Sequence, residues 1–213
     1  MRNGFICVNS CLPAGRRPNS WIFVFKNMKI GILGGTFNPP HVGHLILAQE
    51  VAQKLSLDKI FFVPTNIPPH KESHNVKGCD RLNMVNLAIK EDSRFEALDL
   101  EIKRGGVSYT IDTVRELKNK FKRAEFYLIV GSDLANDFPT WKYFESLKKA
   151  VKIVVAKRRA YPLETKNRFI IAQIVQMGIS SSYIRGLIKK RFSVKYLVND
   201  SVAKYIEKHK LYK

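Results

Sequence analysis

The sequence predicts an α/β fold: a single domain built on a doubly wound parallel β-sheet with helices on both faces. Two observations carry this prediction. Short apolar segments without polar alternation recur along the chain, as is typical of strands buried on both faces. Longer segments with apolar residues at helical spacing lie between them, which indicates strand–helix–strand units and hence parallel strands. The sequence has no internal repeat and no low-complexity linker after residue 28.

The first half of the chain begins with KIGIL at 29–33, whose unbroken apolar character predicts a buried strand. Helical spacing predicts a helix over 41–56. KIFFVPT at 59–65 predicts a strand that a proline closes, and a polar loop without periodicity follows it. Helical spacing returns over 81–92, and the alternation in FEALDLEI predicts a strand over 95–102.

The second half of the chain continues the alternation. A threonine suited to an N-cap opens a predicted helix over 110–121. EFYLIVG and VKIVVAK predict strands over 125–131 and 151–157, with a predicted helix over 139–150 between them. Two further helices are predicted near the carboxyl end, over 180–192 and 201–210.

The charge balance is strongly basic, with a formal net charge of +19 and a pI near 10.0. Such a balance raises the expectation of an anionic partner. The basic residues are scattered along helix-like segments rather than gathered in one block. This distribution favours a solvated lysine-rich surface together with a site that handles phosphates, and a nucleic-acid-binding face stays open as the alternative.

Cysteine usage and hydropathy indicate a cytoplasmic protein. The three cysteines, Cys7, Cys11 and Cys79, form no CxxC pair, which argues against a disulfide framework and against a structural zinc site. No apolar run approaches the roughly 20 residues that cross a bilayer. We therefore expect no membrane association.

Residues 1–27 differ from the rest in carrying four basic residues and no acid. Their apolar stretch WIFVF is too short for the core of a secretory signal. Met28 stands directly before the first predicted strand. We therefore expect residues 28–213 to form the domain and residues 1–27 to be an extension that is poorly ordered or not native.

The turn after the first strand, GGTFNPPHVGH, has the composition of a phosphate site. Its glycines let backbone N–H groups approach an anion, and the helix that follows adds unpaired donors and a partial positive charge. It is neither GxGxxG nor a P-loop. His41 and His44 share one face of the first helical turn and can both donate to one polyphosphate. A metal site is disfavoured because no third ligand is near in sequence.

Two segments of this chain resemble a known superfamily. GGTFNPPHVGH resembles the GTFDPxHxGH signature of the HxGH nucleotidyltransferases, with Asn38 in place of the usual aspartate. GISSSYIR at 178–185 is similar to their ISSTxIR motif, with Ser182 in place of threonine. Serine hydroxyls and free N–H groups opening a helix, followed by Arg185, suit phosphate oxygens. Taken alone, the second segment is better explained as an ordinary serine N-cap with a surface arginine, and the first motif tips the balance toward phosphate binding.

Three more segments narrow the resemblance. VPTNIPPHK, SYTIDT and VGSDLANDFPTW are similar to motifs of the bacterial nicotinate-nucleotide adenylyltransferases, and LVNDSVAKYIEKHKLY resembles the end of these proteins. The likeness extends over essentially all of 28–213. Each segment also has a plain interpretation: a solvated loop, an ordinary turn with an N-cap aspartate, or a core tryptophan.

The resemblance implies a Rossmann-like sheet and transfer of AMP from ATP to nicotinate mononucleotide, a step of NAD biosynthesis. It implies Mg²⁺ brought with ATP, and no protein-bound metal. The implied catalytic residues are His41, His44 and Arg185. The implied ATP-binding residues are Gly34, Gly35, Thr36, Phe37, His41, His44, Gly131, Asp133, Ser180, Ser181, Ser182 and Arg185. The implied mononucleotide-binding residues are Thr36, Asn38, His70, Lys71, Tyr109, Thr110 and Trp141.

Residue chemistry is consistent with these assignments. The Trp141 ring can stack on a pyridine ring, and the backbone at Tyr109 and Thr110, where a strand gives way to a helix, can hold the pyridine carboxylate. The expected partners are the two small-molecule substrates, with no nucleic acid, and a homo-oligomer is possible. A same-fold enzyme acting on the amidated mononucleotide or another phosphate acceptor, and a basic nucleic-acid-binding module with a degenerate site, remain the alternatives.

Overall fold

The computed structural model describes residues 28–68, 76–157, 169–175 and 177–213. The predicted extension at 1–27 lies outside the described residues, so its order stays a prediction.

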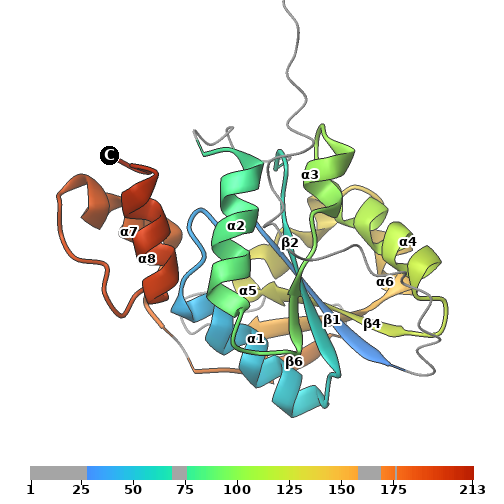
Figure 1. Ribbon diagram of the computed structural model, residues 1–213. Helices are drawn as coiled ribbons and strands as arrows, with labels where there is room; N and C mark the ends of the chain where they lie inside the picture. The colour runs from blue at the N-terminus through green and yellow to red at the C-terminus, as the bar shows by residue number, and fades with distance from the viewer. Residues whose placement is uncertain (1–27, 69–75, 158–168, 176) are drawn as a thin grey trace, which may run out of the picture.

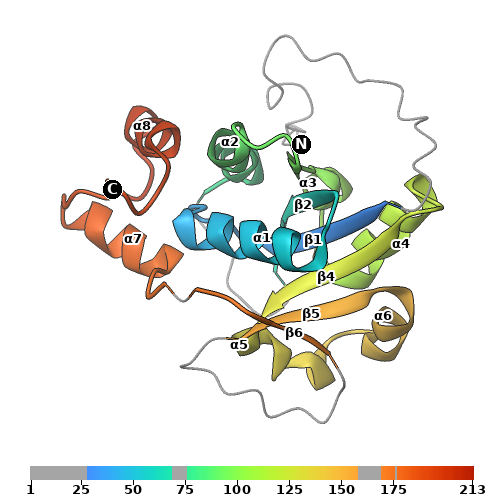
Figure 2. The ribbon, with the colours of Figure 1, turned by 90° about the horizontal axis from the view of Figure 1, so that it is seen from below.

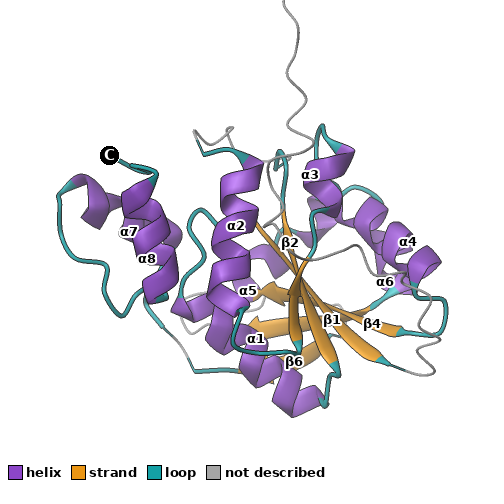
Figure 3. Ribbon diagram, viewed as in Figure 1, coloured by secondary structure: helices purple, strands orange, loops and turns teal. Residues whose placement is uncertain are grey.

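Six strands of the described chain form one sheet in which all strands run parallel (Figures 1 and 3). Their spatial order is β3-β2-β1-β4-β5-β6. The chain starts at the centre, winds outward in one direction, and then returns to the other side of β1. This is the doubly wound order that the sequence predicts. The strands are β1 (Lys29–Gly35), β2 (Lys59–Pro64), β3 (Phe95–Ala97), β4 (Glu125–Gly131), β5 (Lys152–Lys157) and β6 (Ile170–Gln173).

Helices cover both faces of this sheet (Figures 1 and 2). One face carries α1 (Val42–Leu55) and α2 (Gly78–Ile89), and α7 (Ser181–Lys189) and α8 (Asp200–Lys208) lie beside these two helices, with α8 packed against α2. The other face carries α3 (Leu100–Arg104), α4 (Thr110–Lys120), α5 (Ser132–Ala135), the 3-10 helix η1 (Phe138–Thr140) and α6 (Phe144–Ala150).

Side chains of consecutive strand residues pack into two separate hydrophobic cores, one on each face of the sheet. Leu33 and Phe62 pack toward α1 and α2, whereas the preceding residues Ile32 and Phe61 pack toward α4 and α6. Each of these side chains is at most 4% exposed, and full burial of such a side chain contributes about 1.5–3 kcal/mol. Burial on both faces explains why these strands show no polar alternation in the sequence. At Gly31 an added Cβ would lie 2.5 Å from Ile60 Cδ1, so a larger residue there would force the core side chains around it to shift.

The predicted strand over 95–102 is only partly correct. The strand β3 ends at Ala97, and α3 begins at Leu100. The alternation of polar and apolar residues implies that Glu101 faces solvent from a strand. In the structure Glu101 is only 6% exposed. Its carboxylate accepts a hydrogen bond from Thr113 Oγ1 at 2.6 Å, which allows the charged residue to face inward on a helix.

The predicted helix over 139–150 is shorter than expected, and one strand was missed. The helix α6 starts at Phe144, because Trp141 has an extended backbone (φ −73°, ψ 130°) and Tyr143 is left-handed (φ 58°). The strand β6 at the edge of the sheet has only four residues, too few to show a period. Within the described ranges no helix is long and apolar enough to span a membrane.

Candidate active site

The first motif lies at the carboxyl edge of the sheet, where the direction of winding reverses. β1 lies between β2 and β4, and Leu33 pairs with Ile129 near the carboxyl ends of β1 and β4. The turn 36–41 leaves β1 at this edge, and α5 leaves β4 beside it. In open α/β sheets ligands bind in the crevice at such a reversal point. The fold therefore places the motif where a ligand site is expected.

The two histidine rings of the motif pack against each other at the start of α1. His41 is the N-cap residue and is 5% exposed, and His44 belongs to the first turn. Their ring centroids are 3.8 Å apart, with the ring planes tilted by 36°. The backbone N–H of His41 donates to Nδ1 of His44 at 3.2 Å. Because Nδ1 of His44 accepts this bond, a neutral His44 ring carries its proton on Nε2.

The residues around the histidine pair hold it in this arrangement. A Cβ added at Gly43 would lie 3.0 Å from Nδ1 and 3.1 Å from Cε1 of His41, so glycine makes room for that imidazole. Phe37 is buried, and its ring meets the His44 ring edge to face at a centroid distance of 5.0 Å. The apolar ring of Phe37 thus supports the pair from the core side.

The second motif contacts the first directly. Nη1 of Arg185 donates to the carbonyl oxygen of Asn38, and Oγ of Ser181 donates to the carbonyl oxygen of Pro39, each at 2.8 Å. These partners are 147 and 142 residues apart in sequence. Nη2 of Arg185 also donates to Oγ of Ser182 at 3.0 Å. The fold therefore brings the two predicted phosphate motifs into one site.

The serine-rich segment forms the expected helix start. Ser180 is the N-cap of α7, and its hydroxyl accepts a hydrogen bond from the backbone N–H of Tyr183 at 3.1 Å. The helix α7 therefore begins beside the turn with its hydroxyl-bearing first residues, of which Ser182 is exposed.

The start of α1 offers fewer open donors than expected. The N–H of Val42 donates to the carbonyl oxygen of Leu197 at 3.0 Å, and the N–H of His44 donates to the carbonyl oxygen of His41 at 2.9 Å. The backbone at Gly34, at the end of β1, is exposed, and an added Cβ would meet nothing within 4 Å. The exposed backbone of Gly34 is therefore more open to an anion than the N–H groups of Val42 and His44, which are already hydrogen-bonded.

The two remaining ATP-binding candidates follow β4. Gly131 ends that strand and is the N-cap of α5, and Asp133 lies within α5. Of Asp133 only this backbone position is described. Both positions border the reversal point from the side opposite the turn.

On the other flank, the structure brings together two of the three predicted mononucleotide segments. Tyr109 is the N-cap of α4 and Thr110 its first residue. Nζ of Lys142 lies 4.3 Å from the centre of the Tyr109 ring. Trp141 is half-buried, edge to face with Phe138 at 5.0 Å. The third segment contains His70 and Lys71, which lie outside the described residues.

Comparison with known proteins identifies the family. A family model described as cytidylyltransferase-like matches residues 32–187, a range that contains both motifs. A protein from Oceanobacillus iheyensis named "Probable nicotinate-nucleotide adenylyltransferase" is 40% identical over 184 residues, covering 86% of this chain and 96% of its own. A Lactiplantibacillus plantarum protein of the same name is 43% identical over 192 residues, covering 90% and 91%. The chain belongs to the nicotinate-nucleotide adenylyltransferase family.

A solved structure supports the same fold. The nicotinic acid mononucleotide adenylyltransferase of Plasmodium falciparum, complexed with NaAD, matches with a TM-score of 0.75 at 22% identity. The match covers 87% of this chain and 98% of that one. The Rossmann-like single-domain sheet expected for the family is therefore confirmed.

Sequence reasoning missed an arginine that joins two loops of this adenylyltransferase fold. Arg81 of α2 is only 3% exposed, and its guanidinium donates to the carbonyl oxygens of Thr36 at 2.8 Å and Asn66 at 3.2 Å. The backbone N–H of Asn66 in turn donates to Oγ of Ser108 at 2.9 Å. Arg81 contacts main-chain oxygens, which every residue carries, so no pattern of residue types in the sequence predicts this role.

Burial controls the electrostatics behind these loops. Desolvation lowers the pKa of Arg81, although nearby Glu101 acts in the opposite direction. Burial raises the pKa of Glu101, against the hydrogen bonds it accepts from Thr113 and Ser108. A carboxylate is therefore held at some energetic cost close to the buried cation.

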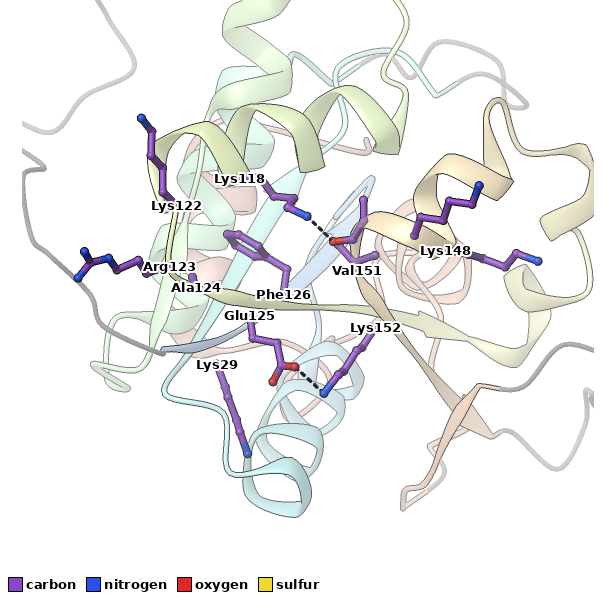
Figure 4. A pocket seen from close by; sticks show the side chains of 12 residues that line it. Lys29, Lys118, Lys122, Arg123, Ala124, Glu125, Phe126, Lys148, Val151 and Lys152 are labelled. Carbon is purple, nitrogen blue, oxygen red and sulfur yellow. Dashed lines mark hydrogen bonds and ion pairs between the residues drawn. The ribbon is translucent and has the colours of Figure 1, made fainter.

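A basic hollow of about 670 Å³ lies at the opposite edge of the sheet (Figure 4). It surrounds the start of β4 and β5, whereas family ligands are expected at the carboxyl ends of the strands. Two of its lysines are already engaged, since Lys118 donates to the carbonyl oxygen of Ala150 at 3.1 Å and Lys152 pairs with Glu125. The motif edge, rather than this hollow, is therefore the candidate active site.

Proposed function

We propose that this adenylyltransferase moves the AMP group of ATP onto nicotinate mononucleotide, giving nicotinate adenine dinucleotide and pyrophosphate. The observation that carries the proposal is the hydrogen-bonded meeting of the two motifs, in which Arg185 and Ser181 grip the turn that bears the histidine pair. Relatives at about 40% identity that carry this enzyme's name support it.

The reaction needs alignment and charge stabilisation rather than a general base. An ionised phosphate oxygen of the mononucleotide attacks the α-phosphorus of ATP and forms the new P–O bond. The bond between the α-phosphorus and the bridging oxygen breaks, and pyrophosphate leaves with the electron pair. Holding the two polyanions in line supplies ~7–11 kcal/mol in well-aligned systems. Each donor to the developing charge supplies about 2.7–4 kcal/mol.

The catalytic groups of this proposal are His41, His44 and Arg185. The paired imidazoles would approach the triphosphate from the start of α1, and the guanidinium would approach it from α7. Because Arg185 already spans the Asn38 carbonyl and Ser182, its remaining N–H donors are held at a defined angle.

The triphosphate contacts are completed by the end of β1 and the start of α7. We assign to them Gly34, Gly35, Thr36, Phe37, Ser180, Ser181 and Ser182. Adenosine would lie across the reversal point, beside Gly131 and Asp133.

The mononucleotide would bind between the turn and the segments at 109–110 and 141–142. The Trp141 ring is half-buried, which leaves part of it available to the pyridine ring. Tyr109 and Thr110 present the start of α4 to the carboxylate. His70 and Lys71 remain predicted phosphate contacts. Asn38 is 4% exposed, which favours a role in holding the turn, and its direct contact with the mononucleotide stays a prediction.

Magnesium would arrive with ATP rather than in a site of its own. Among the described residues no group of three His, Cys, Asp or Glu side chains could hold a metal ion. The residues at the turn are hydrogen-bond donors, which suit phosphate oxygens better than a bare cation. When bound, Mg²⁺ would neutralise part of the phosphate charge.

The remaining assignments are also proposals. We place the catalytic domain in residues 28–213, with 1–27 as an extension, and we place the enzyme in the cytoplasm, where its three cysteines would stay reduced.

The decisive experiment compares two acceptors. The purified protein is incubated with ATP, Mg²⁺ and either nicotinate or nicotinamide mononucleotide, and pyrophosphate release and dinucleotide mass are measured. We expect at least tenfold higher kcat/KM with the acid. Faster turnover of the amide would reassign the acceptor, and no dinucleotide with either would refute the proposed function.

A further inference from the structure

Tyr212 reaches the motif turn from beyond α8. Its hydroxyl donates to Oδ1 of Asn38 at 2.6 Å. The main-chain carbonyl of Asn38 accepts from Arg185, so both oxygen atoms of this buried residue are held, each by a different segment. Asn38 is therefore hydrogen-bonded both to Tyr212 and to Arg185 of the second phosphate motif.

The backbone after α8 is shaped to deliver this contact. Lys210 and Tyr212 both adopt left-handed conformations, with φ of 52° and 65°, which non-glycine residues adopt uncommonly. Between them, the N–H of Leu211 donates to the carbonyl oxygen of Ile206 at 3.0 Å and ties the turn to α8. The Tyr212 ring then packs against the core that contains α1 and α2.

The surroundings keep the Tyr212 hydroxyl a donor. Burial raises the pKa of Tyr212 well above its ordinary value, although the charges of Arg185 and Arg81 act in the opposite direction. Oδ1 of Asn38 can only accept, so the direction of the hydrogen bond is fixed.

We propose that Tyr212 is a positioning residue for the nucleotide turn, holding Asn38 so that His41 stands where ATP needs it. The proposal rests on the function proposed above. Only Pro39 and Pro40 separate Asn38 from His41, and each proline fixes its own φ. A displacement of Asn38 is therefore carried to the histidine rather than absorbed between them.

Tyr205 provides a matched control. Its hydroxyl is also partly buried and hydrogen-bonded, donating to Asp80 at 2.8 Å and accepting from Asn83 at 3.2 Å. Both partners belong to α2, so the Tyr205 hydroxyl is held by that helix and not by the turn. Tyr205→Phe removes a tyrosine hydroxyl that makes two hydrogen bonds, and it does so without touching Asn38.

The test uses the full chain in two measurements. Titration calorimetry with ATP and Mg²⁺ measures affinity, and hydrogen exchange of the ligand-free protein measures protection of the peptide covering 34–47. Tyr212→Phe should weaken ATP binding about fivefold, as loss of one hydrogen bond predicts, and should raise exchange in that peptide. Tyr205→Phe should change neither, although it removes two hydrogen bonds and should lower thermal stability.

Unaltered ATP affinity and unaltered exchange in Tyr212→Phe would overturn the proposal, and so would equal effects of the two variants. A wild-type protein that binds ATP yet makes no dinucleotide would refute the proposed reaction while leaving the Tyr212 result readable. A wild-type protein that fails to bind ATP would overturn both.

Discussion

Replacing Gly43 by alanine should separate activity from stability. The new Cβ would stand 3.0 Å from Nδ1 of His41, so the imidazole must shift by a few tenths of an ångström. Because a misplacement of about 1 Å costs on the order of 10²-fold in rate, we expect kcat/KM for ATP to fall about three- to tenfold. Alanine is favoured over glycine in a helix by up to about 1 kcal/mol, so thermal stability should not fall.

Gly186→Ala is the matched control for this prediction. Gly186 lies in α7, and an added Cβ there would meet nothing within 4 Å. The control should gain the same helix stability and keep kcat/KM. Steady-state kinetics and thermal melts on the two variants decide the matter. Full activity in Gly43→Ala would show that the placement of His41 does not matter for the reaction. A large loss of stability would show that the His41 imidazole cannot move aside for the new methyl group.

Four further substitutions probe the site, its support and the pH dependence of stability. His44→Ala should lower turnover by on the order of 10²–10³, as loss of a charge-stabilising donor does, with a modest change in melting temperature; unaltered turnover would remove the histidine from the mechanism. Trp141→Ala should raise KM for the mononucleotide far more than KM for ATP, and equal increases would make it a core residue. Glu101→Gln should stabilise the protein at neutral pH. Burial raises the pKa of Glu101 in the folded state above its value in the unfolded state. The contribution of Glu101 to the free energy of unfolding is therefore most favourable below the unfolded-state pKa, where the carboxyl is protonated, and is lost as pH rises through the folded-state pKa. Chemical denaturation at several pH values should show that the stability gained by Glu101→Gln disappears in acid. By contrast, Asp92→Asn should destabilise the protein at neutral pH, because hydrogen bonding to Arg94 lowers the pKa of Asp92.

The strand–helix alternation was readable because most strands are buried on both faces, as Ile32 and Leu33 show. Period alone failed at 95–102, where tertiary contacts bury Glu101 on a helix. It also failed at β6, which is too short to carry a period.

The candidate site was predictable where side chains carry the chemistry, as at His41, His44 and Arg185. It was not predictable where a residue acts on main-chain oxygens from afar. Arg81 looks like any helical arginine until its partners at Thr36 and Asn66 are seen. From the sequence, Tyr212 could be noted only as part of a final segment that resembles the end of the family's proteins. Its contact with Asn38 depends on a left-handed backbone conformation, which no local residue pattern predicts.

A crystal structure with a non-hydrolysable ATP analogue tests the central claim most directly. We predict a triphosphate held between the imidazoles of His41 and His44 on one side and Arg185 on the other. A triphosphate seated instead in the basic hollow beside Lys118 and Lys152, at the opposite edge of the sheet, would contradict the proposed site.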